Sequence, residues 1–256
     1  MFELLRKFLL LMLLFVVALS TYLTIQNTTD WREPLWAAIY PINGDGYDST
    51  ARYISQLTEA DFDAIEEFMK REALRYSITI DRPVRVVLGD EVKAQPPAPP
   101  RGGNPFSIAY WSLKLRWWAA SVTRDQQGPS PDIRLFVVYF DPDYRSTVAH
   151  SLGLQKGLIG VVNVFAAPEQ DAQNIFVIAH EMLHTLGATD KYAPPDWLPV
   201  YPEGYADPER NPLYPQTAAE IMGGRIPLSK NSAEMPASLG QALIGPATAV
   251  EIGMLE

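Results

Sequence analysis

The sequence predicts a mixed α/β (α+β) fold built on one sheet. Apolar, β-prone runs alternate with stretches of helical periodicity over the first two thirds of the chain, and loops and short helical segments follow. That order of elements is typical of a mixed sheet with helices packed against it. With 256 residues, 47% of them hydrophobic, the chain is long enough to bury one full core. We therefore expect one globular domain at residues 31–256, preceded by a separate segment at residues 1–30.

The N-terminal segment carries an apolar run from Phe8 to about Ile25. Eighteen residues of helix, at 1.5 Å each, approach the thickness of a bilayer core. Basic residues precede the run and acidic residues follow it, so the positive-inside bias places the rest of the chain outside the cytoplasm. We expect an uncleaved single-pass anchor in the cell membrane, with an extracytoplasmic (periplasmic or extracellular) domain. The alternative is a cleaved signal peptide and a secreted protein, because residues 18–20 resemble a cleavage site.

The first elements of the domain follow from local signals. The apolar stretch at 35–40, followed by a turn-rich stretch at 43–46, predicts a strand and a turn. Thr58 and Asp61 form a capping-box pattern, and the apolar spacing after them predicts a helix over about 58–76. An apolar run predicts a buried strand at 84–88, and the Pro- and Gly-rich residues 95–105 predict a surface loop.

The middle of the chain predicts a helix and three strands. The helix covers 107–122, and we interpret its Tyr110, Trp111, Trp117 and Trp118 as core or helix-packing residues rather than a ligand platform. A strand is expected at 133–140, and residues 147–152 and 158–165 predict a hairpin. We interpret His150, which is isolated in the first hairpin strand, as a surface or packing residue.

The next helix, from about 171 to 186, carries the most informative pattern. Its apolar residues recur on one face, while His180 and His184, two of the three histidines in the chain, lie about 40° apart on the opposite side. With Glu181 they form H-E-x-x-H, the zinc-peptidase signature. Imidazoles at i and i+4 can reach one tetrahedral ion at about 2.0–2.1 Å. Glu181 is then near the ion but off the ligand axis, where a general base belongs.

A third ligand is expected just beyond the helix. Gly187 ends the helix as a left-handed cap, which allows Asp190 to return to the ion three residues later. Three protein ligands leave one position open, as in catalytic zinc sites. Beyond Asp190 we expect an irregular stretch to about residue 215, then closing helical segments at 237–244 and 247–254 around Gly245-Pro246.

Composition excludes several other classes of function. The net charge of −9 comes without a basic stripe, so we expect no nucleic-acid partner. The chain has no cysteine, which rules out disulfides, thiolate zinc sites and cysteine-based latency. The sequence predicts neither the oligomeric state nor the substrate specificity.

These residues resemble the metzincin metallopeptidases, whose motif is H-E-x-x-H-x-x-G-x-x-H followed by a Met-turn. His180, Glu181, His184 and Gly187 match that motif. Asp190 stands in place of the last histidine, as in the snapalysin-like branch, and Lys191-Tyr192 after it is also similar to that branch. Met222, in the stretch 220–223, matches the Met-turn.

The resemblance implies a metzincin-like zincin with Zn²⁺ as its cofactor and a peptide or protein as its substrate. It implies a twisted mixed sheet, a backing helix, the active-site helix and a small, loop-rich C-terminal subdomain. It also implies an edge strand that binds extended peptide by β-augmentation, for which residues 147–152 are our candidate. Tyr192 is either an oxyanion-stabilising residue or a packing residue.

Two alternatives remain open at this stage. In a gluzincin-like site the third ligand would be Glu203, Glu209 or Glu220 instead of Asp190. In a non-catalytic, zinc-stabilised envelope binding protein the metal would only brace the chain between Gly187 and Met222. The leading hypothesis is an exported or membrane-tethered zinc endopeptidase that hydrolyses peptide bonds with Glu181 as its base.

Overall fold

A computed structural model describes residues 6–8, 11–12, 28–100, 102, 104–124, 130–155 and 157–255. Most of the expected membrane anchor at 8–25 lies outside these residues. Among the helices of the described residues, none combines the length and apolar character that a membrane crossing needs.

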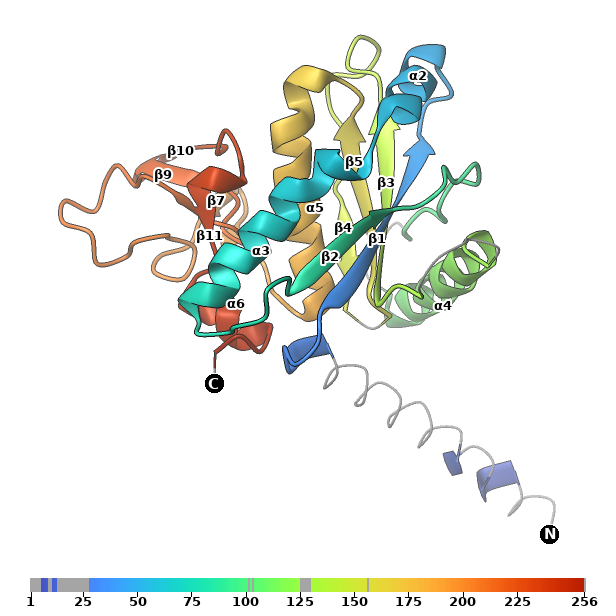
Figure 1. The fold of residues 1–256 in the computed structure, drawn as a ribbon, viewed down its shortest axis with the longest axis horizontal. Coiled ribbons are helices and arrows are strands. Elements are labelled where there is room, and N and C mark those ends of the chain that lie inside the picture. Colours follow the sequence, from blue (N-terminus) through green and yellow to red (C-terminus); the bar gives the residue numbers. More distant parts are fainter. Residues whose placement is uncertain are drawn as a thin grey trace.

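Five strands form a mixed, mostly parallel sheet in the order β2-β1-β3-β5-β4 (Figure 1). The parallel strands are β1 (Leu35–Asn43), β2 (Val84–Leu88), β3 (Ile133–Phe140) and β5 (Ile159–Phe165). The short β4 (Leu152–Leu154) pairs antiparallel with β5 at the edge of the sheet. The predicted mixed sheet is therefore confirmed, and so are the strands predicted at 35–40, 84–88, 133–140 and 158–165, which the structure shows to be parallel to one another.

Helices cover both faces of the sheet. On one face lie α2 (Asp48–Gln56), α3 (Asp63–Arg75) and α5 (Asp171–Leu186), and on the other lies α4 (Pro105–Val122) (Figure 1). Successive residues of β1 point to opposite faces, so Ala37 and Ile39 join the core under α3 and α5, while Ala38 and Tyr40 join the core under α4. Both faces are buried, which explains why the strands are almost continuously apolar.

The helix predicted at 58–76 is confirmed with one difference. Its first turn is the 3₁₀ segment η1 (Glu59–Phe62), and α3 continues from Asp63. The capping box is present, because the Thr58 amide donates to Asp61 Oδ2 at 2.7 Å. The sequence analysis did not predict α2, a short and mostly polar helix whose only buried residues are Thr50 and Ile54.

Helix α4 is also confirmed, beginning two residues earlier than expected. The Asn104 side chain accepts from the Phe106 amide at 2.9 Å, and Pro105 occupies the first helical position. Trp111 and Trp118 are buried, as expected of packing residues. Tyr110 and Trp117 are 71% and 73% exposed, so their assignment to the core was wrong. Aromatic residues lie on both the buried and the exposed side of this helix, so residue type alone could not show which side faces the sheet.

The hairpin is confirmed, but its first strand is displaced from the predicted 147–152. Only Leu152 of that range belongs to β4. Just before β4, a side-chain hydrogen bond takes the place of backbone pairing with β5: Ser151 Oγ accepts from the Asn163 amide at 3.0 Å. At Gly153 the strand comes so close to α5 that a Cβ atom would lie 2.4 Å from the Cβ of His184.

The C-terminal part is rich in loops and lies beside α5 (Figure 1). It contains short strands and two short helical segments: β6 (Tyr192–Ala193), β7 (Leu198–Pro199), β8 (Ala219–Glu220), β9 (Ile226–Ser229), β10 (Ser232–Glu234), η3 (Leu239–Gln241), β11 (Ala242–Leu243) and α6 (Pro246–Glu251). The helical segment predicted at 237–244 is confirmed only for the short 3₁₀ turn η3, because β11 after it pairs in parallel with β8. The last predicted segment is confirmed as the shorter α6.

Candidate metal centre

Helix α5, preceded by the 3₁₀ turn η2 (Pro168–Gln170), is the frame of the site. It spans the predicted residues 171–186 and buries the predicted apolar stripe, including Ile178, Met182 and Leu183, in the core. Gly187 ends it in the left-handed region, at φ 114°. A residue with a Cβ atom would be strained in that conformation, so the glycine fixes the direction in which the chain leaves the helix.

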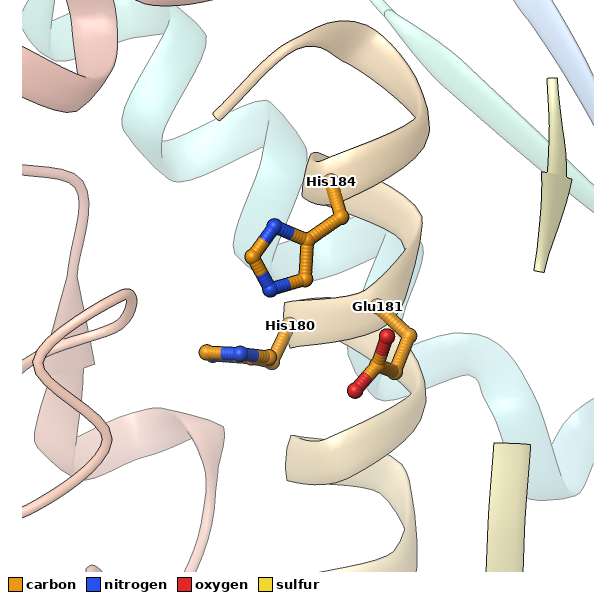
Figure 2. A group of neighbouring side chains, drawn as sticks. All are labelled: His180, Glu181 and His184. Carbon is orange, nitrogen blue, oxygen red and sulfur yellow. The ribbon is translucent and has the colours of Figure 1, made fainter. Parts of the chain in front are cut away.

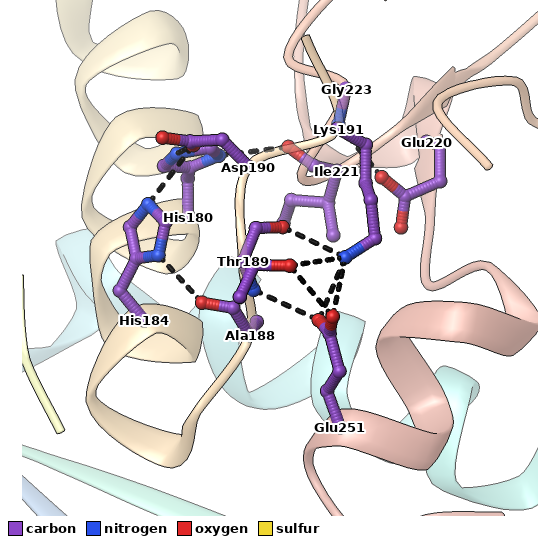
Figure 3. A network of polar contacts seen from close by, with 10 residues as sticks. All are labelled: His180, His184, Ala188, Thr189, Asp190, Lys191, Glu220, Ile221, Gly223 and Glu251. Atoms are coloured by element: carbon purple, nitrogen blue, oxygen red, sulfur yellow. Dashed lines mark hydrogen bonds and ion pairs between the residues drawn. The ribbon is translucent and has the colours of Figure 1, made fainter. Parts of the chain in front are cut away.

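His180 and His184 are each held by a backbone carbonyl. His180 Nδ1 lies 2.9 Å from the carbonyl oxygen of Ile221, and His184 Nδ1 lies 2.8 Å from that of Ala188 (Figure 3). A carbonyl can only accept, so each Nδ1 carries the proton in the neutral ring, and each Nε2 has a free lone pair. Metal-binding histidines typically donate their other ring N–H to such a carbonyl, which orients the ring.

Asp190 meets both imidazoles. Its Oδ1 atom lies 3.3 Å from His180 Nε2 and 3.1 Å from His184 Nε2. Three acceptors at these distances repel one another unless a proton or a metal ion lies among them. Ligands held at about 2.0–2.1 Å around a tetrahedral ion are roughly 3.3 Å apart, so these contacts fit a zinc-sized cation.

Glu181 lies on the same side of α5 as the two histidines (Figure 2). It is buried, and its Oε2 atom has no hydrogen-bond partner among the described residues. Burial raises the pKa of Glu181, and the neighbouring His180 and His184 offset only part of that effect. A buried carboxylate with a free oxygen next to a cluster of imidazoles has the properties of a general base.

Two sets of three residues at this place could hold a metal ion. The ligand atoms of His180, Glu181 and His184 all lie within 4.8 Å of one another. The Asp190 carboxylate, however, has one oxygen within 3.3 Å of both Nε2 atoms. Asp190 is therefore the better placed of the two carboxylates to complete a three-ligand set with the histidines.

The charges of the site support this assignment. Burial alone would raise the pKa of Asp190, but its contacts with His180 and His184 outweigh burial and lower it. Burial lowers the pKa of His184, yet the contacts with Asp190 and Glu181 raise it overall. The site therefore attracts positive charge to the space between these side chains.

The loop that carries Asp190 is tied to the C-terminal part at the next residue. Lys191 is buried, and its Nζ lies 2.7 and 2.8 Å from the two carboxylate oxygens of Glu251 in α6 and 2.7 Å from Thr189 Oγ1 (Figure 3). The Lys191 amide also donates to the carbonyl oxygen of Met222 at 2.9 Å. Asp190 is thus held between two anchored neighbours.

Met222 lies in a turn beside the histidines. Its side chain is fully buried, and the preceding carbonyl, that of Ile221, accepts from His180. Glu220 supports the turn, since its carboxylate accepts from the Gly223 amide at 2.7 Å and from Thr248 Oγ1 at 2.7 Å. Both oxygens are engaged there, because Oε1 also accepts from the Gly245 amide at 3.1 Å.

The gluzincin-like alternative gains no support from these positions. The Glu220 carboxylate is engaged by the turn and by α6, while Glu203 and Glu209 are exposed in the loop between β7 and β8. The expectation of Asp190 as ligand and the expected place of Met222 agree with the geometry.

A cavity of about 280 Å³ opens beside the histidines. Its lining comes from α5, from the residues before β4, from the β6–β7 hairpin, from the turn after Met222 and from the residue after β10: His150, Ser151, Phe176, Val177, His180, Glu181, Tyr192, Trp197, Gly223, Gly224, Arg225 and Met235. His150 is at the surface as expected, but the sequence did not indicate that it faces this cavity. The Tyr192 ring is stacked 6.2 Å from that of His180, and burial together with Asp190 raises the pKa of Tyr192.

The features that the sequence analysis missed are mostly backbone groups. The carbonyls of Ile221 and Ala188 hold the two histidines. Every residue has a backbone carbonyl, so residue types could not indicate these contacts. The pairing of Lys191 with Glu251 joins residues 60 positions apart, and no local pattern predicts it.

No protein-family model matches the chain, and a search of curated proteins finds no match. The function of this chain is therefore inferred from the geometry of its side chains.

Proposed function

We propose that this protein is a zinc-dependent endopeptidase, exported and tethered to the membrane by its N-terminal segment. The observation that carries the proposal is the convergence of Asp190 Oδ1 on the Nε2 atoms of His180 and His184. Two imidazoles and one carboxylate make a three-ligand set typical of catalytic zinc. When bound, the ion acts as a Lewis acid toward the scissile carbonyl and lowers the pKa of a water molecule that reaches it.

Glu181 then has a defined task. Its unpartnered Oε2 accepts the proton of the attacking water and later delivers it to the leaving amine. The raised pKa favours this exchange, because a base that is too acidic would not hold the proton between the two steps. The burial of Glu181 keeps bulk water from competing for the carboxylate.

The edge strand and the cavity supply a place for a peptide. Among the described residues β4 pairs only with β5, so the backbone groups on its other side are available to an extended chain. The close approach at Gly153 brings this edge against the turn of α5 that carries Glu181 and His184. The cavity beside Tyr192 receives one substrate side chain. These features, with the turn at Met222, support a snapalysin-like metzincin.

The decisive variant is Glu181→Gln. It keeps the shape and all three proposed ligands but cannot accept a proton, so we expect zinc to stay bound while peptide cleavage falls by about 10²- to 10⁴-fold. Zinc content by elemental analysis and turnover of a quenched-peptide library measure the two effects. Glu169→Gln, an exposed carboxylate in η2, is the matched control and should change neither.

Two results would contradict the mechanism. Undiminished cleavage by Glu181→Gln would exclude Glu181 as the base. Zinc binding by the wild-type chain, with loss of stability on chelation but no cleavage of any library peptide, would instead favour the non-catalytic binding protein.

A further inference from the structure

The outer side of α4 carries a row of large apolar side chains. Phe106, Tyr110, Leu113 and Trp117 are 85%, 71%, 62% and 73% exposed. Their spacing places all four within an arc of about 60° on the helix. We call these four residues the α4 ridge.

The α4 ridge is not part of the hydrophobic core. The opposite side of the same helix already buries Trp111, Leu115, Trp118 and Ala119 against the sheet. In a helix that packs on a sheet, the solvent-facing side normally carries polar residues. A continuous apolar outer side is instead typical of a surface that contacts a partner.

The charge around the ridge indicates what the partner is. The helix and the two residues after it, 105–124, contain three basic residues and no acidic one, although the whole chain has 30 acidic residues and a net charge of −9. Lys114 and Arg124 are exposed on and just beyond the helix. Aromatic side chains combined with basic ones are typical of helices that lie in the headgroup region of an anionic membrane.

The start of the folded domain places it close to a bilayer. The apolar run ends at about residue 25, and Thr28 is already buried in the domain. Trp31 is also buried in the domain, and its indole nitrogen donates to the carbonyl oxygen of Ile252 at 2.8 Å. Three residue steps span roughly 10 Å at most, so a domain anchored by this run lies against the membrane.

Helix α4 lies toward the same end of the domain. Figure 1 shows α4 beside the end of the sheet where β1 begins. Asp132, ten residues after α4 in the sequence, lies at that end, because its carboxylate accepts from the Trp36 amide at 2.9 Å. Arg116 in α4 also lies beside Gly157, just before β5, a strand parallel to β1 through β3.

We propose that the α4 ridge seats the domain on the anionic lipid surface of the membrane that holds the N-terminal run. This inference rests on the tethered form of the proposed function. A second copy of the chain fits the ridge less well, because pairing two ridges would bring together two basic segments. The described part of the apolar run does not cover it either, since Phe8, Leu11 and Met12 are exposed.

Seating on α4 leaves the metal centre open. Helix α5 packs on the opposite face of the sheet, so lipid contact at α4 does not bury the cavity. The substrate would therefore be a peptide reaching the membrane surface from the water phase.

The absence of cysteine allows a clean test. Leu113→Cys in the ridge and Leu74→Cys in α3, a leucine of similar exposure on the other face, each accept one environment-sensitive fluorophore. The full chain is reconstituted into vesicles of phosphatidylcholine with phosphatidylglycerol, some lipids carrying a nitroxide quencher. We expect blue-shifted, quenched emission at position 113 and aqueous emission at position 74.

A charge variant tests the lipid chemistry. Lys114→Gln with Arg124→Gln should lower the ratio of seated to free α4 by roughly 30-fold, the combined effect of two basic residues at an anionic surface. The matched control, Arg52→Gln with Lys230→Gln, removes two exposed basic residues elsewhere and should leave emission at position 113 unchanged.

The outcomes separate this inference from the tether. A chain that floats with vesicles but shows aqueous emission at position 113 overturns the seating and leaves the tether intact. A chain that does not float overturns both. A blue shift at position 113 that grows with protein concentration and needs no lipid also overturns it, because a second copy then covers the ridge.

Discussion

Asp190 is the residue whose role most sharply distinguishes a metal site from a chance cluster. Asp190→Ala removes the oxygen that lies within 3.3 Å of both Nε2 atoms and leaves the imidazoles held by their carbonyls. We expect zinc affinity to fall by at least about 100-fold, more than the 10- to 100-fold typical of losing a group that only hydrogen-bonds to a ligand.

Competition with a fluorescent zinc chelator measures that affinity. The control is Asp196→Ala, which removes an exposed carboxylate in the following hairpin and should leave affinity unchanged. Wild-type affinity in Asp190→Ala would move the third ligand to Glu181 and remove the proposed base.

Most of this residue-scale geometry could be predicted from the sequence. The period of the α-helix places His180 and His184 on one side, and a glycine at position 187 allows the chain to reverse toward Asp190. The groups that orient the rings could not be predicted, because they are carbonyls whose positions depend on how the C-terminal part folds back.

At the scale of elements, α6 holds the loop that carries Asp190, because Glu251 in α6 pairs with Lys191 in that loop. Burial raises the pKa of Glu251, but its contacts with Lys191 and Thr189 outweigh burial and lower it. A carboxylate with a lowered pKa stabilises the fold above its unfolded-state pKa, near 4.3, and loses that contribution as the pH falls through the folded value.

Glu251→Gln should therefore destabilise the protein at pH 7 by about 1–2 kcal/mol, less than a fully buried pair because the Glu251 side chain is 28% exposed. The difference from wild type should shrink below about pH 4. Urea unfolding at several pH values measures it, with the exposed Glu234→Gln as control. A difference that does not change with pH would mean that the ion pair is not its source.

The elements that the sequence predicted well are those whose signal is local. Strands β2 and β3 and helix α5 have the expected bounds, because each has a continuous apolar run or a full apolar stripe. The end of the helical segment predicted at 237–244 is the strand β11 instead, because its pairing with β8, some twenty residues away, overrides local propensity. The ridge on α4 was missed because aromatic residues face both sheet and solvent there.

At the scale of the whole molecule, a metal at this site would join two halves of the fold. The histidines belong to the helix under the sheet, while Asp190 belongs to the loop held by Lys191, Met222 and α6. A ligand that binds only the native state stabilises it by mass action, by about 4 kcal/mol at a thousandfold excess over Kd. Zinc should thus act as a cross-link between the sheet layer and the C-terminal part.

We therefore expect the Tm of the wild-type chain to rise with free zinc concentration and to fall on addition of a chelator. Glu181→Gln should show the same rise, since its ligands are intact, whereas Asp190→Ala should show almost none. Thermal unfolding followed by circular dichroism across a zinc titration measures all three chains. If zinc raised the Tm of Asp190→Ala as much as that of wild type, the ion would be bound without the loop, and the link between the two halves of the molecule would have to come from Lys191 and Glu251 alone.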